Sequence, residues 1–235
     1  MKIALIGYGK MGKAIERLAT DRGHKICAII NSGHANIEDL KKADVAIEFT
    51  QPESAYENIK MCIDLNVPII SGTTGWLDKM DAIRNYCSEK DGTFFYASNY
   101  SIGVNLFFKI NEMVAKLMSD RSQYLPSIEE IHHVHKKDSP SGTAITLAEG
   151  LIKHLKNKKK WVEGKQSTEE IIGIESLRQG DVPGTHSIMY ESQMDKITLT
   201  HTAHTRDSFA LGAIMVAEWL PGKKGFLTMD DYMGI

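Results

Sequence analysis

The stretch Lys2–Gly12, KIALIGYGKMG, decides how the first part of this chain folds. An apolar run, Lys2–Ile6, meets three glycines at positions 7, 9 and 12, and a helical pattern follows over Lys13–Arg22. In a strand–turn–helix, the first glycine of GxGxxG permits the tight turn, the second lets the backbone approach a pyrophosphate, and the third lets the helix pack closely. The N–H groups of the helix start then face the anion. The pattern predicts a dinucleotide site, and a purely structural glycine turn is the alternative.

Apolar runs and helical patterns alternate through the rest of the first hundred residues. Further apolar runs at 25–30, 43–49, 67–71 and 93–97 are separated in part by helical patterns at 53–66 and 77–89. Such alternation favours a parallel sheet covered by helices on both faces.

The pattern changes after residue 102. Helical patterns at 104–118 and 142–155 accompany a strand pattern at 127–135, and three more strand patterns, at 169–176, 186–192 and 196–204, follow with no helix between them. This order predicts a mixed or antiparallel sheet. The helical pattern at 209–220 is expected to return to the first domain.

We therefore predict an α/β protein of two domains. Residues 1–102 and 207–235 would form a Rossmann-type dinucleotide-binding domain. Residues 103–206 would form a second α+β domain, with a mixed or antiparallel sheet, that binds substrate and mediates oligomerisation.

Composition narrows the class of protein. The chain has 235 residues, of which 42% are hydrophobic and 25% charged, and its net charge of -2 lacks the basic excess typical of nucleic-acid binders. No apolar run approaches the roughly 20 residues of a transmembrane helix. Three widely spaced cysteines are typical of reduced thiols in a cytoplasmic protein. The lysine-rich run 156–160 is expected to be a solvated helix end.

The segment Glu130–Ala144, EIHHVHKKDSPSGTA, is the second stretch with clear chemistry. If the strand alternation holds, His132 and Lys136 share one face and form a cationic wall suited to a dicarboxylate. Either side chain could donate a proton. Ser141 is a plausible N-cap of the following helix, whose first N–H groups, at Gly142 and Thr143, could hold a carboxylate.

Two other interpretations of this segment remain. A zinc site built on His132, His133 and His135 is disfavoured, because neighbouring strand residues point to opposite faces and no cysteine pair lies nearby. We therefore expect no metal. The second interpretation is a polar strand with ordinary exposed histidines.

The spacing E-x-H-x3-K-x-D-x-P-S-G-T-A resembles the signature of the 4-hydroxy-tetrahydrodipicolinate reductase (dihydrodipicolinate reductase) family of the lysine and diaminopimelate pathway. The resemblance extends over nearly the whole chain. It includes the glycine turn and the segments 72–75, 97–101, 103–105, 178–180, 184–186 and 206–209.

The resemblance implies an NADH- or NADPH-dependent reduction of 4-hydroxy-tetrahydrodipicolinate to tetrahydrodipicolinate with loss of water. It implies that His132 and Lys136 are catalytic, as proton donors or acceptors. It further implies that His133 contacts the substrate, and that Gly142 and Thr143 bind a substrate carboxylate. Family members are typically cytoplasmic homotetramers that assemble through the sheet of the second domain.

The same resemblance, together with the glycine turn, gives the expected cofactor contacts. Asn31 replaces the acidic residue that many relatives carry after the second strand, so we expect both nucleotides to bind, with a lean toward NADPH. Thr73 and Thr74 could instead cap the following helix, Asn99 and Tyr100 could be turn residues, and Arg206 either reaches the cofactor or only starts a helix. The expected contacts are Gly7, Tyr8, Gly9, Lys10, Met11, Gly12, Asn31, Gly72, Thr73, Thr74, Ser98, Asn99, Tyr100 and Ser101.

Two functional alternatives compete with this interpretation. Another NAD(P)-dependent imine or amino-acid dehydrogenase would share the glycine turn but leave the histidine–lysine segment unexplained. A non-catalytic NAD(P) sensor would have no use for proton donors beside a carboxylate site.

Overall fold

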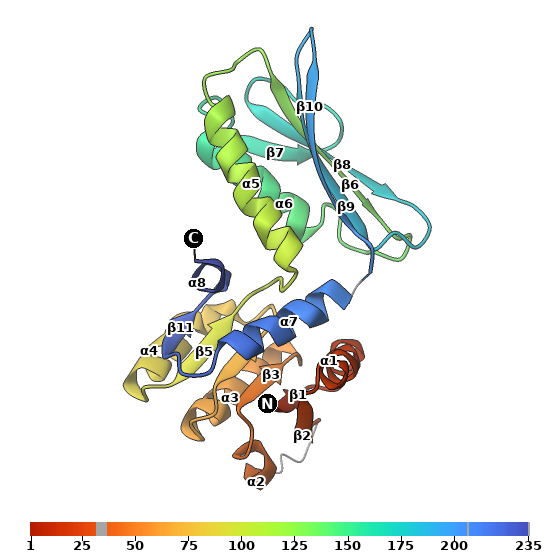
Figure 1. Ribbon diagram of the computed structural model, residues 1–235. Coiled ribbons are helices and arrows are strands. Elements are labelled where there is room, and N and C mark those ends of the chain that lie inside the picture. Colours follow the sequence, from red (N-terminus) through yellow and green to blue (C-terminus); the bar gives the residue numbers. More distant parts are fainter. Residues whose placement is uncertain (32–36, 206, 235) are drawn as a thin grey trace. The chain divides into compact units, whose positions relative to one another are not determined.

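The computed structural model describes residues 1–31, 37–205 and 207–234. The chain divides into two compact units, one formed by Met1–Ile102 with Asp207–Ile235 and the other by Gly103–Arg206 (Figure 1). The expectation for Arg206 lies outside the described residues.

The first unit is built on a parallel sheet of six strands in the order β11-β5-β4-β3-β1-β2. Its strands are β1 (Lys2–Ile6), β2 (Lys25–Ile30), β3 (Val45–Glu48), β4 (Ile69–Ser71), β5 (Thr93–Tyr96) and β11 (Gly225–Leu227). Its helices are α1 (Lys10–Asp21), α2 (Ile37–Leu40), α3 (Pro52–Asp64), α4 (Met80–Glu89) after a short 3-10 turn η1 (Leu77–Lys79), α7 (Asp207–Trp219) and α8 (Met229–Met233).

Both faces of this sheet are buried, as the alternation of strands and helices predicts. Along β1, Ile3 and Leu5 belong to the core that contains α1 and α7, whereas Ala4 and Ile6 belong to the core that contains α3 and α4. The predicted Rossmann-type sheet is therefore confirmed. Its strand order places β2 and β3 on opposite sides of β1, and such a switch point is where nucleotides bind in folds of this kind.

The second unit has a mixed sheet of five strands in the order β10-β9-β6-β8-β7. Its strands are β6 (Leu125–His132), β7 (Lys160–Glu163), β8 (Ile171–Arg178), β9 (Gly184–Glu191) and β10 (Lys196–Ala203). β6 pairs antiparallel with β9 and parallel with β8. Two helices, α5 (Ile102–Met118) and α6 (Gly142–His154), cover one face of the sheet, where Ile128, Ile174 and Ile188 form the core (Figure 1).

Two local predictions for the second unit are wrong. β6 ends at His132 and the chain turns there, with the Lys136 amide donating to the His133 carbonyl, so the strand alternation does not extend to Lys136. The run 156–160 is not a solvated helix end. α6 ends at His154, Lys158 is only 8% exposed, and Lys160 begins β7.

Cys62 and Cys87 are buried, Cys27 is half-buried, and all three are free thiols. Among the described helices, none combines the length and the apolar character that crossing a bilayer requires.

Candidate functional site

The glycine turn lies between β1 and α1, beside the end of β3. Gly7 adopts φ +93°, and a Cβ there would lie 2.0 Å from the Phe49 carbonyl oxygen. A Cβ on Gly12 would lie 2.4 Å from the Gly7 oxygen, so the fold itself requires both glycines. Gly9 is different, because a Cβ there would meet nothing within 4 Å. Gly9 is also the N-cap of α1 and makes no side-chain cap, which leaves the helix start open to an anion.

The other residues of the turn divide between surface and core. Lys10 is exposed, whereas Met11 packs against the α1 side of the core. The Tyr8 hydroxyl donates to Glu16, and the Lys13 ammonium lies 5.9 Å from the centre of its ring. Asn31, at the end of β2, is exposed.

The Gly72–Thr74 loop is fixed by a buried carboxylate that sequence reasoning missed. Glu48, fully buried at the end of β3, accepts from Thr73 Oγ1 at 2.9 Å and from Ser71 Oγ at 2.5 Å. The Thr73 hydroxyl therefore neither caps a helix nor faces solvent, while Thr74 is exposed. A Cβ on Gly72 would lie 2.0 Å from the Phe49 ring.

Ser98–Ser101 follows β5, and the structure divides this segment between core and surface. The Tyr100 side chain is 2% exposed and its hydroxyl donates to the Ser71 carbonyl at 2.8 Å. A Cβ on Gly212 of α7 would lie 1.7 Å from the Tyr100 oxygen, so this backbone also fixes α7. Tyr100 can offer a cofactor only its backbone. Ser98 is exposed, and the Asn99 side chain accepts from the Ser101 amide at 2.9 Å.

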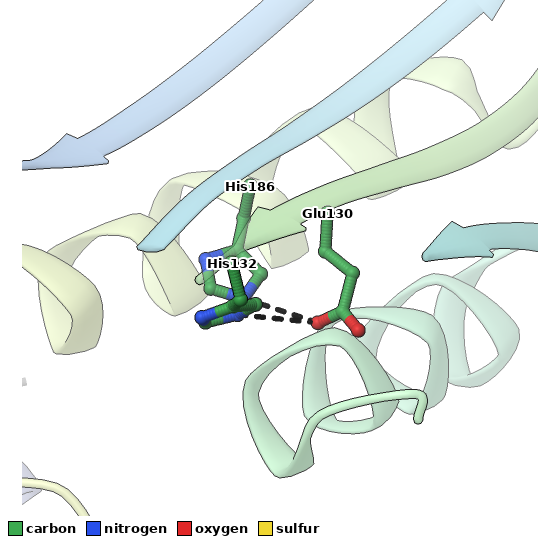
Figure 2. Close-up of side chains that lie close together, drawn as sticks. All are labelled: Glu130, His132 and His186. Carbon is green, nitrogen blue, oxygen red and sulfur yellow. Dashed lines mark hydrogen bonds and ion pairs between the residues drawn. The ribbon is translucent and has the colours of Figure 1, made fainter. Parts of the chain in front are cut away.

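In the second unit, three titratable side chains lie close together because buried and less buried residues alternate along β6 and because β6 pairs with β9. Pro126, Ile128, Glu130 and His132 are the buried residues of β6, and register places Glu130 opposite His186 of β9. The Nε2 atoms of His132 and His186 lie 3.3 Å apart, and Glu130 Oε2 lies 3.4 Å and 3.6 Å from them (Figure 2).

Gly184 makes room for this arrangement. A Cβ at this position would lie 2.9 Å from His132 Cε1. In the segment Gly184-Thr185-His186, Gly184 therefore leaves space for the His132 ring, and His186 is the hydrogen-bond partner of that ring.

Glu130 is a fully buried anion. Its Oε1 accepts from the Ser141 amide at 3.0 Å and lies 3.3 Å from Arg178 Nη2. Burial opposes ionisation, but hydrogen bonds from His132, His186 and Ser141 outweigh it and hold the pKa of Glu130 well below its usual range. Burial lowers the pKa of His186, which is therefore neutral near pH 7. The cluster thus combines one carboxylate, one neutral imidazole and the His132 ring.

The same three side chains could hold a metal ion, since their ligand atoms all lie within 4.8 Å of one another. Two imidazoles and a carboxylate are ligands that zinc accepts. The zinc alternative considered from the sequence used His132, His133 and His135, and only His132 belongs to this cluster. The Nε2 atoms of the two rings lie within hydrogen-bond distance of each other and Glu130 pairs with Arg178, whereas the buried His186 Nδ1 has no partner in the described part of the chain.

The N-terminus of α6 lies directly beside the cluster. Ser141 is its N-cap, as predicted: its Oγ accepts from the Ala144 amide at 3.2 Å and lies 3.2 Å from His186 Nε2. Gly142 is exposed, a Cβ there would meet nothing within 4 Å, and the first turn contains no acidic side chain. Gly142 and half-buried Thr143 thus begin an open helix end suited to an anion.

The loop after β6 carries Lys136. Its Nζ lies 2.8 Å from both carboxylate oxygens of Asp138. Burial disfavours the Asp138 charge, but the hydrogen bond from Lys136 outweighs burial and lowers the pKa of Asp138. Arg178 donates to the carbonyl oxygens of Lys136 and Asp138 and so ties this loop to Glu130. His133 is half-buried and His135 is exposed.

Sequence reasoning assigned no role to Glu130, Arg178 or His186. Glu130 could have been found as the one acidic residue on the apolar side of the alternating strand. Nothing local distinguishes Arg178 and His186, because only the strand register brings them to Glu130.

Comparison with known proteins accounts for both units. Residues 1–100 match the family model described as dihydrodipicolinate reductase, N-terminus, and residues 103–233 match its C-terminus. A 4-hydroxy-tetrahydrodipicolinate reductase of Christiangramia forsetii is 46% identical over 235 residues, covering 99% of this chain and 98% of that protein. The reductase of the same name from Archaeoglobus fulgidus is 34% identical and covers 99% of this chain and 100% of that protein.

Solved structures share the fold. A dihydrodipicolinate reductase from a Paenisporosarcina species, solved with dipicolinate bound, gives a TM-score of 0.79 at 23% identity and covers 97% of both chains. An amine dehydrogenase from Mycobacterium smegmatis gives a TM-score of 0.61 at 11% identity, covering 98% of this chain and 95% of that one. At these identities the likeness concerns the fold alone.

Proposed function

This chain belongs to the dihydrodipicolinate reductase family, and from that premise we propose how its own residues perform the reaction. It is an oxidoreductase that reduces 4-hydroxy-tetrahydrodipicolinate to tetrahydrodipicolinate with NAD(P)H, in the lysine and diaminopimelate pathway. The bound nicotinamide supplies the hydride. The observation that carries the assignment of roles is the buried Glu130–His132–His186 cluster beside the open N-terminus of α6.

Substrate binding requires positive charge for two carboxylates. The N-terminus of α6, at Gly142 and Thr143, holds one of them through backbone N–H groups. His133 and Lys136 bind the other, and the ion pair with Asp138 keeps the Lys136 ammonium oriented. The dipicolinate bound by the Paenisporosarcina relative supports a dicarboxylate ligand.

We assign the proton transfer to His132. Its Nε2 lies 3.4 Å from the Glu130 carboxylate and 3.3 Å from His186 Nε2, so a carboxylate and a neutral imidazole flank the ring. Lys136 lies in a loop and is paired with Asp138, which suits a substrate clamp and a source of positive charge.

The two assignments predict different kinetic defects. His132→Gln should lower kcat by about 100-fold or more with a small change in KM, because the donor acts only in the transition state. Lys136→Met should raise KM for the substrate as well. His135→Gln, an exposed neighbour, is the matched control. A His132→Gln enzyme with an unchanged rate would contradict the assignment.

For the cofactor, we propose that residues of the glycine turn and the loops after β4 and β5 bind the nucleotide. The open space at Gly9 supports a pyrophosphate at that position. Gly72, Thr73, Ser98, Asn99, Tyr100 and Ser101 would contribute mainly through the backbone, since the Thr73 and Tyr100 side chains already have partners. Exposed Lys10 and the neutral Asn31 favour NADPH slightly over NADH.

The direct test is the loss of absorbance at 340 nm with NADH and with NADPH. The substrate is generated in situ from pyruvate and aspartate semialdehyde by a dihydrodipicolinate synthase. Synthase-dependent oxidation is expected with both nucleotides, and faster with NADPH. No oxidation by folded protein that binds the cofactor would contradict the proposed residue roles and favour a sensor.

We also propose a cytoplasmic homotetramer that forms through the second sheet. Exposed apolar side chains on and beside β10 support this assembly: Met194 is 91% exposed and Ile197 41%. Sedimentation velocity of Ile197→Lys against the parent protein tests it, and a tetramer that survives the substitution would place the interface elsewhere.

A further inference from the structure

The second unit contains a pocket that the reaction does not use. Its volume is about 340 Å³, within the range of small-molecule sites. It lies where β6 begins, whereas His132 ends the same strand of eight residues, so the two places are roughly 23 Å apart at 3.3 Å per residue. Its lining includes Met118, Arg121, Tyr124, Leu155, Lys158 and Tyr190.

The ammonium group of Lys158 is a cation in the lining of this pocket, and the residue is almost inaccessible to solvent. The residue is 8% exposed, and its Nζ donates to the carbonyl oxygens of Thr168 and Ile171. Both partners in the described part of the chain are neutral, and an ammonium has a third donor. Burial lowers the pKa of Lys158, and the attraction of Glu169 only partly opposes this. Glu169 also lines the pocket, but its carboxylate accepts from Asn157 Nδ2 and forms no ion pair with Lys158 in the described part of the chain. A buried cation without an ion-pair partner is unfavourable, so the Lys158 side of the pocket favours an anion.

Tyr190 also lines the pocket, and its hydroxyl has no partner in the described part of the chain. Tyr190 is 1% exposed. Burial raises its pKa well above the usual range, so the hydroxyl remains a neutral donor. A buried donor without an acceptor costs stability, and an oxygen atom of a ligand would restore the bond.

The other lining residues indicate which kind of ligand fits the pocket. Leu155, Met118 and Tyr124 belong to or pack against the core of the second unit and give the pocket an apolar side. Arg121 adds a cation that makes no ion pair with any described residue, whereas Lys156 is paired with Asp120. From this combination we propose that the pocket binds a small carboxylic acid with an apolar body. Lys158 and Arg121 attract its carboxylate, and Tyr190 donates to it.

Binding is tested with the full-length enzyme and a panel of butanoate, hexanoate, benzoate and phenylacetate. Saturation-transfer NMR and calorimetry are performed with NADPH and dipicolinate at saturating concentrations, so that the reaction site is occupied. We expect at least one acid to bind saturably, and its uncharged amide to bind about tenfold more weakly, because a hydrogen-bonded charge is lost.

Variants locate the site. Tyr190→Phe and Lys158→Met should each weaken the acid about tenfold, while Tyr56→Phe and Lys196→Met, which lie outside the pocket lining, serve as matched controls. Arg121→Gln, in an exposed loop, provides a third test should Lys158→Met fail to fold. The proposal is overturned if no acid binds, if excess dipicolinate removes the binding, or if every folded pocket variant binds like the parent. Turnover at 340 nm is measured separately, so these outcomes are independent of the proposed reaction.

Discussion

At the scale of single residues, Glu130 sets the charge of the second-unit cluster. The side chain is fully buried and joins Arg178, Ser141 and both histidines. An anion in this position holds Arg178, which in turn donates to the carbonyl oxygens of Lys136 and Asp138 and so fixes the loop that carries Lys136.

The substitution Glu130→Gln tests this role. It removes the carboxylate partner of the half-buried Arg178 and should lower the free energy of unfolding by about 2 kcal/mol, since hydrogen bonds between charged groups are lost. Urea unfolding at pH 7 measures the effect. Glu129→Gln, a half-buried neighbour on the opposite side of β6, is the control and should change stability by less than about 0.5 kcal/mol. Equal effects of the two substitutions would contradict the charge argument.

His186 makes stability depend on pH. The pKa of His186 in the folded protein lies below its ordinary value of 6.5. Between these two pKa values the unfolded chain binds a proton that the folded chain does not bind. The free energy of unfolding therefore falls as the pH falls from 7 through the folded pKa, by at most about 1.4 kcal/mol per pH unit for this one group.

The variant His186→Asn should show a shallower decline between pH 7 and 5, measured by urea unfolding at each pH. His135→Asn, at an exposed position, should retain the slope of the parent. A His186→Asn slope identical to the parent would show that another group causes the decline.

At the scale of elements, the β1–α1 turn contains two glycines that the fold requires, Gly7 and Gly12, and one, Gly9, that we propose the nucleotide requires. Gly12→Ala brings a Cβ to 2.4 Å from the Gly7 oxygen and should cost about 2 kcal/mol of stability. Gly9→Ala meets no protein atom, so its melting temperature should stay near that of the parent while KM for NADPH rises. Thermal unfolding and steady-state kinetics distinguish them, and a Gly9→Ala enzyme with the parent KM would place the pyrophosphate elsewhere.

At the scale of the whole molecule, hydride transfer requires the nucleotide and the dicarboxylate to be bound together. Dipicolinate should therefore raise the melting temperature more in the presence of NADPH than in its absence. A ligand at 100 times its Kd stabilises by about 2.7 kcal/mol, and coupling adds to this value. Differential scanning fluorimetry over a grid of both ligands measures the coupling. Strictly additive shifts would favour a protein that senses the nucleotide without reducing a substrate.

The sequence by itself determined the two chemistry-bearing segments and the class of each sheet. A strand–turn–helix with GxGxxG and a period-2 strand before PSGTA are local patterns, and local patterns are set by backbone geometry and side-chain periodicity. The N-cap at Ser141 and the strand limits at Lys2–Ile6 follow from the same local rules.

Only the tertiary structure decided which polar groups meet. His132 and His186 are 54 residues apart in sequence, and the register of β6 on β9 brings Glu130 opposite His186. The same is true of Thr73 and Tyr100, whose hydroxyls bind Glu48 and the Ser71 carbonyl instead of facing solvent. Strand register and burial arise from contacts between distant segments, and they determine partners and charge that no local pattern contains.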